Sequence, residues 1–369
     1  MELNDGKIKV IAYYLPQFHP FKENDEWWGP GFTEWTNVGK AKPLFKGHYQ
    51  PKVPADLGYY DLRVEDVAVK QAELAKEAGI TGFCYWHYWF GEGRKLLEMP
   101  AERMLKSGHP DFPFCFAWAN HSWWRKSWSP SGNSELLIEQ KYPGIEDIDE
   151  HFYYCLPFFQ DERYMRYNGK PIFLIYKHLD YKNISQFIHR WNELAVKEGL
   201  SEGFYFLTGL ISFDTLSDAL DKDLSGGILD INARERLGLP FVKRGIELLK
   251  RKLGLSSVGL PHKVNYNELI RKAWTNDLLN RNDVIPQIMP NWDHTPRSGK
   301  YGQVYVNATP ESFEKMLSKI LPLVDQKENK LIVLKSWNEW GEGNYMEPDL
   351  KYGHGFIEAL SKQLKQYQK

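Results

Sequence analysis

The sequence predicts an α/β protein, a single-domain (β/α)₈ (TIM) barrel with long βα-loops, and three observations favour that fold class. Eight short apolar runs, rich in β-branched and aromatic residues, recur along the 369 residues. Such runs are typical of strands buried on both faces of a parallel sheet. Amphipathic helical patterns lie between them. The glycine-rich fingerprint of an open doubly wound sheet does not follow the first run, where the chain reads LPQFHP. Closing eight such units leaves no unpaired edge, so a barrel is favoured.

The expected strands alternate with the helices along the whole chain. In order they are KVIAYYL (9–15), GITGFCYW (79–86), FPFCFAWA (112–119), PIFLIY (171–176), GFYFLTG (203–209), GGILDI (226–231), VIPQIM (284–289) and KLIVLKSW (330–337).

The helices are predicted from apolar stripes of period near 3.6 and from their end signals. Residues 63–78 place alanines and valines on one stripe and stop at a glycine, and residues 184–198 repeat this pattern. Thr309 and Pro310 supply an N-cap and a first-turn proline for the helix before the eighth strand. A closing helix, 355–367, returns the chain to the first strand.

Two segments depart from the repeat, the loop 16–60 and an insert at 233–265. The insert contains PFVKRGIELLKRK, which predicts a basic amphipathic helix over 241–253. Packing on the barrel exterior is the first interpretation, and contact with a membrane surface or a partner protein is the alternative. No linker composition divides the chain, so we expect residues 1–369 to form one catalytic domain.

Composition narrows the functional class. The formal net charge is -1, which gives no electrostatic reason to expect a nucleic acid or a membrane as partner. Aromatic residues make up 15% of the chain, which suits either a groove for hydroxyl-covered ligands or a large aromatic core. Cys84, Cys115 and Cys155 are expected to be buried thiols in a reducing compartment. No apolar leader or membrane-spanning stretch is present, so a cytoplasmic protein is expected.

The active site of a (β/α)₈ enzyme lies at the C-terminal ends of the strands. The aromatic and polar residues of this chain gather in those windows, which favours a sugar-binding groove over an aromatic core. The candidate substrate-binding residues are Tyr13, Tyr14, Gln17, His19, Trp28, Glu34, Trp35, Tyr85, Trp86, His87, Tyr88, Trp89, Trp118, Asn120, His121, Trp123, Tyr176, His178, Trp292, Asp293, Arg297, Trp337, Asn338, Trp340 and Tyr345.

The eighth window holds the candidate catalytic residues, Glu339 and Glu342. Cleaving or forming a glycosidic bond requires one carboxyl group as acid and a second as nucleophile or base. In an extended strand these two side chains would point to opposite faces, but Gly341 and Gly343 allow a sharp turn that brings them together. Two close carboxyl groups in a partly dry site have pKa values that are pushed apart. The alternative is a polar loop with two solvated acids.

Five motifs in order resemble a known family. AYYLPQFHP (12–20), GFCYWHYWF (82–90), FAWANHSW (116–123), NWDHTPR (291–297) and WNEWGEGNYMEPD (337–349) resemble the WbsX-type proteins of bacterial polysaccharide biosynthesis. Those proteins are in turn similar to glycoside hydrolase family 99, the endo-α-1,2-mannosidase and mannanase barrels. The resemblance extends from about residue 8 to about residue 350.

The resemblance implies a (β/α)₈ barrel that uses no metal or other cofactor and retains anomeric configuration. Residues 338–343 match the hydrolase motif N-E-W-H-E-G. This match implies that Glu339 is the base that assists the substrate's own 2-hydroxyl, giving a 1,2-anhydro-sugar intermediate. Glu342 would be the general acid toward the leaving oxygen and later the base for water. Gly341 stands where the hydrolases carry histidine, which puts mannose specificity in doubt.

Three functions follow as hypotheses. The first is a retaining endo-acting glycoside hydrolase or transglycosylase on a bacterial polysaccharide or a lipid-linked glycan. The second is a glycosyltransferase of O-antigen, capsule or lipopolysaccharide biosynthesis, and the third is a glycan-binding barrel without catalysis. The D-x-D spacings at 147–149 and 221–223, which a metal-dependent transferase would use, lie in expected helical stretches away from the mouth. The spacing of the histidines indicates no zinc site.

Overall fold

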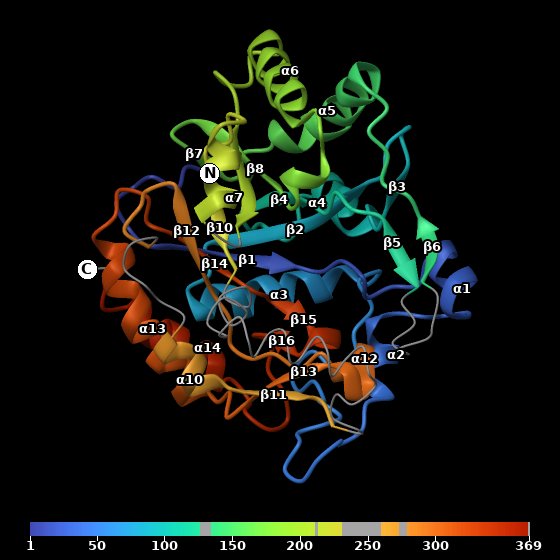
Figure 1. The fold of residues 1–369 in the computed structure, drawn as a ribbon, viewed down its shortest axis with the longest axis vertical. Coiled ribbons are helices and arrows are strands. Elements are labelled where there is room, and N and C mark those ends of the chain that lie inside the picture. The colour runs from blue at the N-terminus through green and yellow to red at the C-terminus, as the bar shows by residue number, and fades with distance from the viewer. Residues whose placement is uncertain (126–133, 211–212, 231–259, 273–278, 368–369) are drawn as a thin grey trace.

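The fold was analysed in a computed structural model that describes residues 1–125, 134–210, 213–230, 260–272 and 279–367 (Figure 1). Its centre is a closed barrel of eight parallel strands. They are β1 (Lys9–Tyr14), β2 (Gly82–Trp89), β4 (Phe114–Trp118), β8 (Lys170–Ile175), β9 (Tyr205–Leu210), β10 (Gly226–Leu229), β12 (Val284–Ile288) and β14 (Leu331–Leu334).

Closure is seen in the strand register. β1 pairs in parallel with β2 on one side, where Ile11 lies opposite Gly82, and with β14 on the other, where Lys9 lies opposite Leu331. Every residue of β1, β4, β10, β12 and β14 is buried, as continuous apolar runs predict for strands covered on both faces. All eight strands expected from the sequence are present, and the predicted (β/α)₈ barrel is confirmed.

Helices cover the outside of the barrel. They are α3 (Glu65–Ala78), α4 (Met99–Ser107), α5 (Ile145–Phe159), α6 (Ile184–Lys197), α7 (Phe213–Leu220), α10 (Tyr266–Lys272), α13 (Pro310–Asp325) and α14 (Gly355–Leu364). The four that the sequence predicted, α3, α6, α13 and α14, begin near the predicted residues. Gly79 ends α3 in the left-handed conformation, and the Thr309 side chain caps α13 by accepting from the Ser312 amide at 3.3 Å. The end signals in the sequence therefore act as predicted.

The long βα-loops carry further short elements, which lie on the side toward which the β1 arrow points in Figure 1. The loop after β1 forms α1 (Lys22–Trp28) and α2 (Glu34–Gly39). β5 (Trp123–Arg125) pairs with β6 (Glu135–Ile138) after β4, and α12 (Thr295–Ser298) follows β12. β15 (Asn338–Glu339), the 3₁₀ turn η3 (Trp340–Glu342) and β16 (Asn344–Tyr345) follow β14. These loops place the candidate site residues.

Several more short elements complete the described part of the fold. They are β3 (Lys95–Leu96), β7 (Arg166–Tyr167), β11 (His262–Asn265), β13 (Gln303–Val306), and the 3₁₀ turns η1 (His178–Asp180) and η2 (Gly299–Tyr301). The predicted basic helix at 241–253 lies outside the described residues. Where the chain is described, no helix combines the length and the apolar composition that a bilayer crossing would need.

Two minor predictions are also settled by the fold. All three cysteines are buried free thiols. The D-x-D carboxylates have structural partners, since Asp147 accepts from Trp89 Nε1 and from the Glu92 amide, and Asp149 forms an ion pair with Arg190 at 2.7 Å. Residues 221–223 form the turn that ends α7. Neither spacing lies at the mouth of the barrel, as predicted.

Candidate active site

A cavity of about 750 Å³ opens at the C-terminal ends of the barrel strands. Its walls come from the end of β2 and from the loops after β1, β4, β8, β12 and β14, so residues far apart in the sequence meet there. Eleven of the predicted site residues line this cavity: Gln17, Trp28, Glu34, Trp86, Tyr88, His121, Trp123, Tyr176, Arg297, Glu339 and Glu342. The structure thus brings both candidate catalytic glutamates into an aromatic-walled cavity.

The other predicted substrate-binding residues do not line the cavity. They are Tyr13, Tyr14, His19, Trp35, Tyr85, His87, Trp89, Trp118, Asn120, His178, Trp292, Asp293, Trp337, Asn338, Trp340 and Tyr345. Most of them are buried in the barrel core or behind the loops, where they pack against other aromatic rings.

Strand pleating explains much of this division. Side chains alternate between the two faces of a strand, so only every second residue of β2 can face the cavity. Trp86 and Tyr88 do so. His87 points outward and stacks on His151 of α5, and Trp89 donates its indole N–H to Asp147 of the same helix. The sequence window located the strand end but did not resolve the face of each residue.

Some cavity residues were not predicted from the sequence: Leu15, Asn24, Phe32, Asn37, Lys40, Ala119, Ser122, Trp124, Leu137, Lys177, Asp180, His294 and Lys335. Those of α1 and α2 lie in a long loop, where no periodicity indicates which side chains face the barrel. Two had a usable signal. His294 lies inside the NWDHTPR motif, and Lys335 follows the last residue of β14, a position from which a side chain can reach the mouth.

Glu339 and Glu342 are brought together by the turn that follows the eighth barrel strand. β15 and β16 pair in antiparallel fashion around η3, and Gly343 ends that turn at φ +61°, a left-handed conformation that favours glycine. Arg297 Nη1 lies 3.4 Å from Glu339 Oε1 and 2.5 Å from Glu342 Oε1. Two oxygens that share one nitrogen in this way are at most about 6 Å apart, near the separation of retaining glycosidases.

The two carboxyl groups have opposite pKa shifts. Burial, and then the nearby Glu342 charge, raise the pKa of Glu339 to about 7. For Glu342, burial acts in the same direction, but the Arg297 guanidinium and His294 outweigh it and hold its pKa well below the usual range. At neutral pH, Glu342 is therefore a carboxylate and Glu339 is partly protonated. The pair has one group of each kind that acid–base catalysis requires.

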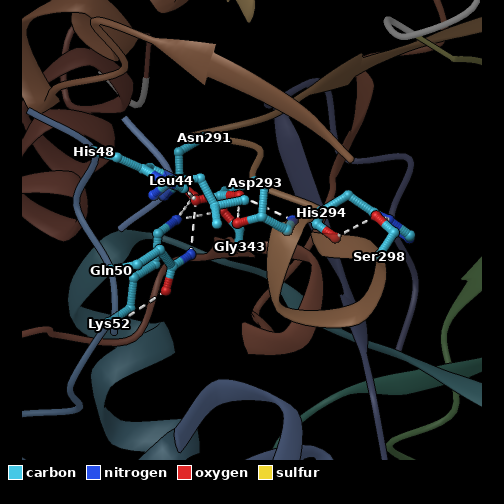
Figure 2. Close-up of polar contacts among 10 residues, drawn as sticks. Leu44, His48, Gln50, Lys52, Asn291, Asp293, His294, Ser298 and Gly343 are labelled. Carbon is cyan, nitrogen blue, oxygen red and sulfur yellow. Dashed lines mark hydrogen bonds and ion pairs between the residues drawn. The ribbon is translucent and has the colours of Figure 1, made fainter. Parts of the chain in front are cut away.

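A buried polar cluster holds the glutamate turn from behind (Figure 2). Asp293 donates its backbone N–H to the Glu342 carbonyl at 2.8 Å, and its Oδ2 accepts from His48 Nε2 at 2.8 Å and from Gln50 Nε2 at 2.7 Å. Lys52 Nζ donates to the Gly343 carbonyl at 3.2 Å. Asp293 was predicted to contact substrate. The structure gives it a supporting position instead, because its side chain is buried among these donors.

One further polar cluster lies away from the cavity. His87, His151 and Cys155 place their donor atoms within 4.8 Å of one another, and all three are buried. The two histidine Nε2 atoms lie 2.8 Å apart, at hydrogen-bond distance, and burial lowers both pKa values, so the rings are neutral. Aromatic rings surround the pair on several sides. This cluster fits a hydrogen-bonded core pair between β2 and α5.

The fold and the cavity define the protein as a (β/α)₈ barrel with two close carboxyl groups after its eighth strand. Residues 10–360 match the family described as Glycosyltransferase WbsX, and the chain belongs to that family. The resemblance inferred from the five motifs is thereby confirmed.

Two relatives of known sequence match nearly the whole chain. The uncharacterized protein WxcX of Xanthomonas campestris pv. campestris, in strains ATCC 33913 and B100, is 32% identical over 364 residues. The match covers 96% of this chain and 49% of the relative, so the chain spans about half the length of the curated relatives it matches.

Solved structures confirm the fold. The GH99 endo-α-mannosidase of Bacteroides thetaiotaomicron, solved in complex with bis-tris-propane, aligns over 97% of both chains with a TM-score of 0.56 and 13% identity. A glycoside hydrolase-like protein aligns over 97% of this chain and 94% of its own, with a TM-score of 0.55 and 14% identity. At these identities the likeness concerns the barrel and its loops, not the chemistry.

Proposed function

We propose that this chain is a carbohydrate-active enzyme that cleaves or transfers glycosyl groups, with Glu339 and Glu342 as its catalytic carboxyl groups. One observation carries the proposal: both carboxyl groups contact the same Arg297 nitrogen inside an aromatic-walled cavity at the end of the eighth strand. A (β/α)₈ barrel places its chemistry at this position. The family description and the glycoside hydrolase structures point to the same class.

Retention of anomeric configuration is the stereochemical outcome that the geometry favours. Inverting enzymes separate their carboxyl groups by about 6.5–9.5 Å to admit a water molecule, whereas the two groups here share one guanidinium nitrogen. The resemblance to family 99 implies a particular retaining route, in which Glu339 draws the proton from the substrate's 2-hydroxyl and Glu342 protonates the leaving oxygen.

The proton distribution of the glutamate pair adds a condition to this route. Glu342 is held as a carboxylate by Arg297, whereas the acid role requires it to carry a proton. The pair titrates as a unit, so a proton on Glu339 can pass to Glu342 when substrate binds. We therefore infer that this proton moves to Glu342 when substrate enters, which leaves Glu339 as the base.

The substrate class follows from the cavity walls. Trp28, Trp86, Trp123 and Trp124 present aromatic surface, and sugar rings pack their C–H faces on such rings. The cavity is also lined by Lys335 and the two glutamates, which can form hydrogen bonds with sugar hydroxyl groups. A polysaccharide or an oligosaccharide of a lipid-linked glycan fits this combination.

Glycosyl transfer is the second candidate, and the family description favours it. In a retaining mechanism a sugar hydroxyl can replace water as acceptor without any change in the catalytic pair. Transglycosylation therefore needs only an acceptor subsite, while a nucleotide-sugar transferase would need a nucleotide site of its own.

The test is product analysis on a panel of α-mannosyl oligosaccharides and bacterial surface polysaccharides in ¹⁸O-labelled water. We expect a product with retained configuration by ¹H NMR, ¹⁸O incorporation if water is the acceptor, and longer glycans if a sugar is. Glu339→Gln and Glu342→Gln should lower turnover about 10²-fold or more, while the exposed α3 variant Glu73→Gln should match the wild type. Inverted product would refute the retaining route, and turnover only with UDP- or GDP-sugars would refute both hydrolysis and transglycosylation.

A further inference from the structure

Gly341 lies against the side chain of Glu34, between the two candidate catalytic residues. A Cβ atom at position 341 would lie 1.8 Å from Glu34 Oε2 and 3.1 Å from Arg297 Nε. The backbone of Gly341 is not in the left-handed region, so the obstacle to a side chain there is space, and a Cβ atom would have to displace the Glu34 carboxylate. The carboxylate of Glu34 thus fills the volume that any other residue at position 341 would need.

Glu34 is an unusual residue to find in this place. Its side chain is only 2% exposed, and burying a carboxylate costs several kcal/mol unless a partner offsets the loss of water. Among the described residues its ion-pair partner is Arg297, whose Nη2 lies 3.0 Å from Glu34 Oε2. The same guanidinium contacts Glu339 and Glu342 through Nη1. One arginine therefore contacts three carboxyl groups. Glu34 contacts the guanidinium nitrogen Nη2, whereas the catalytic pair contacts Nη1.

The local sequence fixes Glu34 in this position. It is the first residue of α2, and Thr33 and Thr36 form a capping box that sets the start of the helix. The next residue, Trp35, packs on Trp340 with ring centroids 5.4 Å apart and donates its indole N–H to the Tyr60 carbonyl at 2.7 Å. Trp35 thus anchors α2 to the glutamate turn next to Glu34.

We propose that Glu34 is a positioning residue of this site, which holds the Arg297 guanidinium against Glu339 and Glu342, and that position 341 must be glycine so that the Glu34 carboxylate can reach it. The proposal rests on the proposed function only in taking Glu339 and Glu342 as the reacting pair. It predicts that substitutions at positions 34 and 341 have non-additive effects on stability, because the two side chains would compete for the same small volume.

The charges around the pair give the sign of the titration effect. Arg297, His294 and Lys335 are the basic groups facing the two glutamates, and Glu34 adds a negative charge on the side of Glu339. The hydroxyls of Tyr88 and Tyr176 also face them, and their pKa values are raised. Removing the Glu34 charge by itself lowers the pKa of Glu339, but the release of Arg297 raises it, and Arg297 has the larger effect. The higher of the two titrations of the pair therefore moves to higher pH when Glu34 no longer holds Arg297.

The test uses Glu34→Gln, Glu34→Ala, Gly341→Ala and the double variant Glu34→Ala/Gly341→Ala, with Gly39→Ala as matched control. Gly39 is the last residue of α2, is exposed, and has open space where a Cβ would lie. Crystal structures report the position of Arg297. Carboxyl ¹³C NMR titrations, assigned from the signals lost in Glu339→Gln and Glu342→Gln, report the pKa values of the glutamate pair. Melting temperatures report the energetic coupling between positions 34 and 341.

We expect Gly341→Ala to displace Glu34 and Arg297 together and to lower the melting temperature, whereas Gly39→Ala leaves both unchanged. Glu34→Gln should move the higher titration of the pair to higher pH, because the guanidinium that lowers the pKa of Glu339 is no longer held against it. The double variant should melt higher than the sum of the single effects predicts, because the added methyl group then enters vacated space.

On any substrate that the wild type turns over, Glu34→Gln should lower kcat about tenfold or more with KM little changed, which a merely structural role would not produce. An Arg297 that keeps its place in Glu34→Ala, or single effects that add in the double variant, would overturn the inference. The structural and NMR readouts need no turnover, so they decide this question even if the proposed enzymatic function fails.

Discussion

At the scale of single residues, the site depends on buried charged side chains, each of which has a charged or hydrogen-bonding partner. Arg297 balances Glu34 and Glu342, and Asp293 accepts from His48 and Gln50 behind them. Removing one member of such a set leaves its partners buried without compensation, which costs more than the net worth of the contact. The residues that support the turn should therefore be as sensitive to substitution as those that reach the cavity.

Asp293→Ala tests this expectation. The substitution removes the acceptor for His48, Gln50 and Thr295, so we expect the free energy of unfolding to fall by about 3 kcal/mol. Asp293→Asn keeps one acceptor oxygen and should cost less. Urea denaturation measures both, with exposed Glu73→Ala as control. Equal stability of Asp293→Ala and wild type would show that the cluster does not hold the turn.

The sequence predicted the residues of the site unevenly. Glu339, Glu342 and Arg297, which line the cavity, each lie in a short motif at a strand end, so the sequence could single them out as candidates. Tyr85 and Trp86 are neighbours in the same motif, yet only Trp86 faces the cavity. Closure of the barrel and the tilt of its strands decide which face turns inward, and neither is encoded in a local window.

At the scale of elements, α1 and the β5–β6 hairpin build the outer wall of the cavity. Trp28 of α1 is 45% exposed, stacks on Phe32 with centroids 5.8 Å apart, and lies under the Arg125 guanidinium of β5. Such a ring is held in place by its neighbours while one face remains open to a ligand. It is suited to pack against a sugar some distance from the glutamates.

Trp28→Ala should therefore weaken substrate binding without changing the chemical step. We expect KM to rise about tenfold, equivalent to about 1.4 kcal/mol, with kcat little changed. Tyr301→Ala, an exposed aromatic residue that does not line the cavity, is the control and should leave KM unchanged. A fall in kcat at constant KM would instead place Trp28 in the chemistry.

The elements themselves were largely predictable. Strands and the helices 63–78, 184–198 and 355–367 came from periodicity and end signals, and their ends differ from the structure by a few residues. α1, α2 and the β5–β6 hairpin were not predicted, because short loop elements have little periodicity and take their position from packing on the barrel.

At the scale of the whole molecule, buried acids should make stability depend on pH. Glu347 is buried and accepts hydrogen bonds from Tyr60, Gln71 and Trp340. Burial raises its pKa to about 7. A carboxyl group whose folded-state pKa is raised binds more protons when folded. Its contribution to stability is present below its ordinary pKa of 4.5 and is lost as pH rises toward 7.

Glu347→Gln should remove this dependence, because the amide does not titrate. Between pH 4.5 and pH 7 the wild type should lose free energy of unfolding relative to the variant, on the order of 3 kcal/mol. Guanidinium denaturation at a series of pH values measures the difference, with Glu73→Gln as control. Parallel stability curves for wild type and Glu347→Gln would mean that Glu347 titrates normally.

The fold of the whole chain was the most predictable level, because eight apolar strands with helices between them admit few other architectures. That residues 1–369 form one domain stays a prediction, as does a cytoplasmic location. Function was predicted only through five motifs, since the same barrel supports many chemistries and only the site distinguishes them.

The central claim, that Glu339 and Glu342 act as one catalytic unit, is tested most directly by a double-mutant cycle on turnover. On the best substrate found, kcat/KM is measured for wild type, Glu339→Gln, Glu342→Gln and the double variant, with folding checked by circular dichroism. Groups that act together are non-additive, so the double variant should lose no more activity than the poorer single variant. Single variants with wild-type kcat/KM, or losses that multiply in the double variant, would contradict the account.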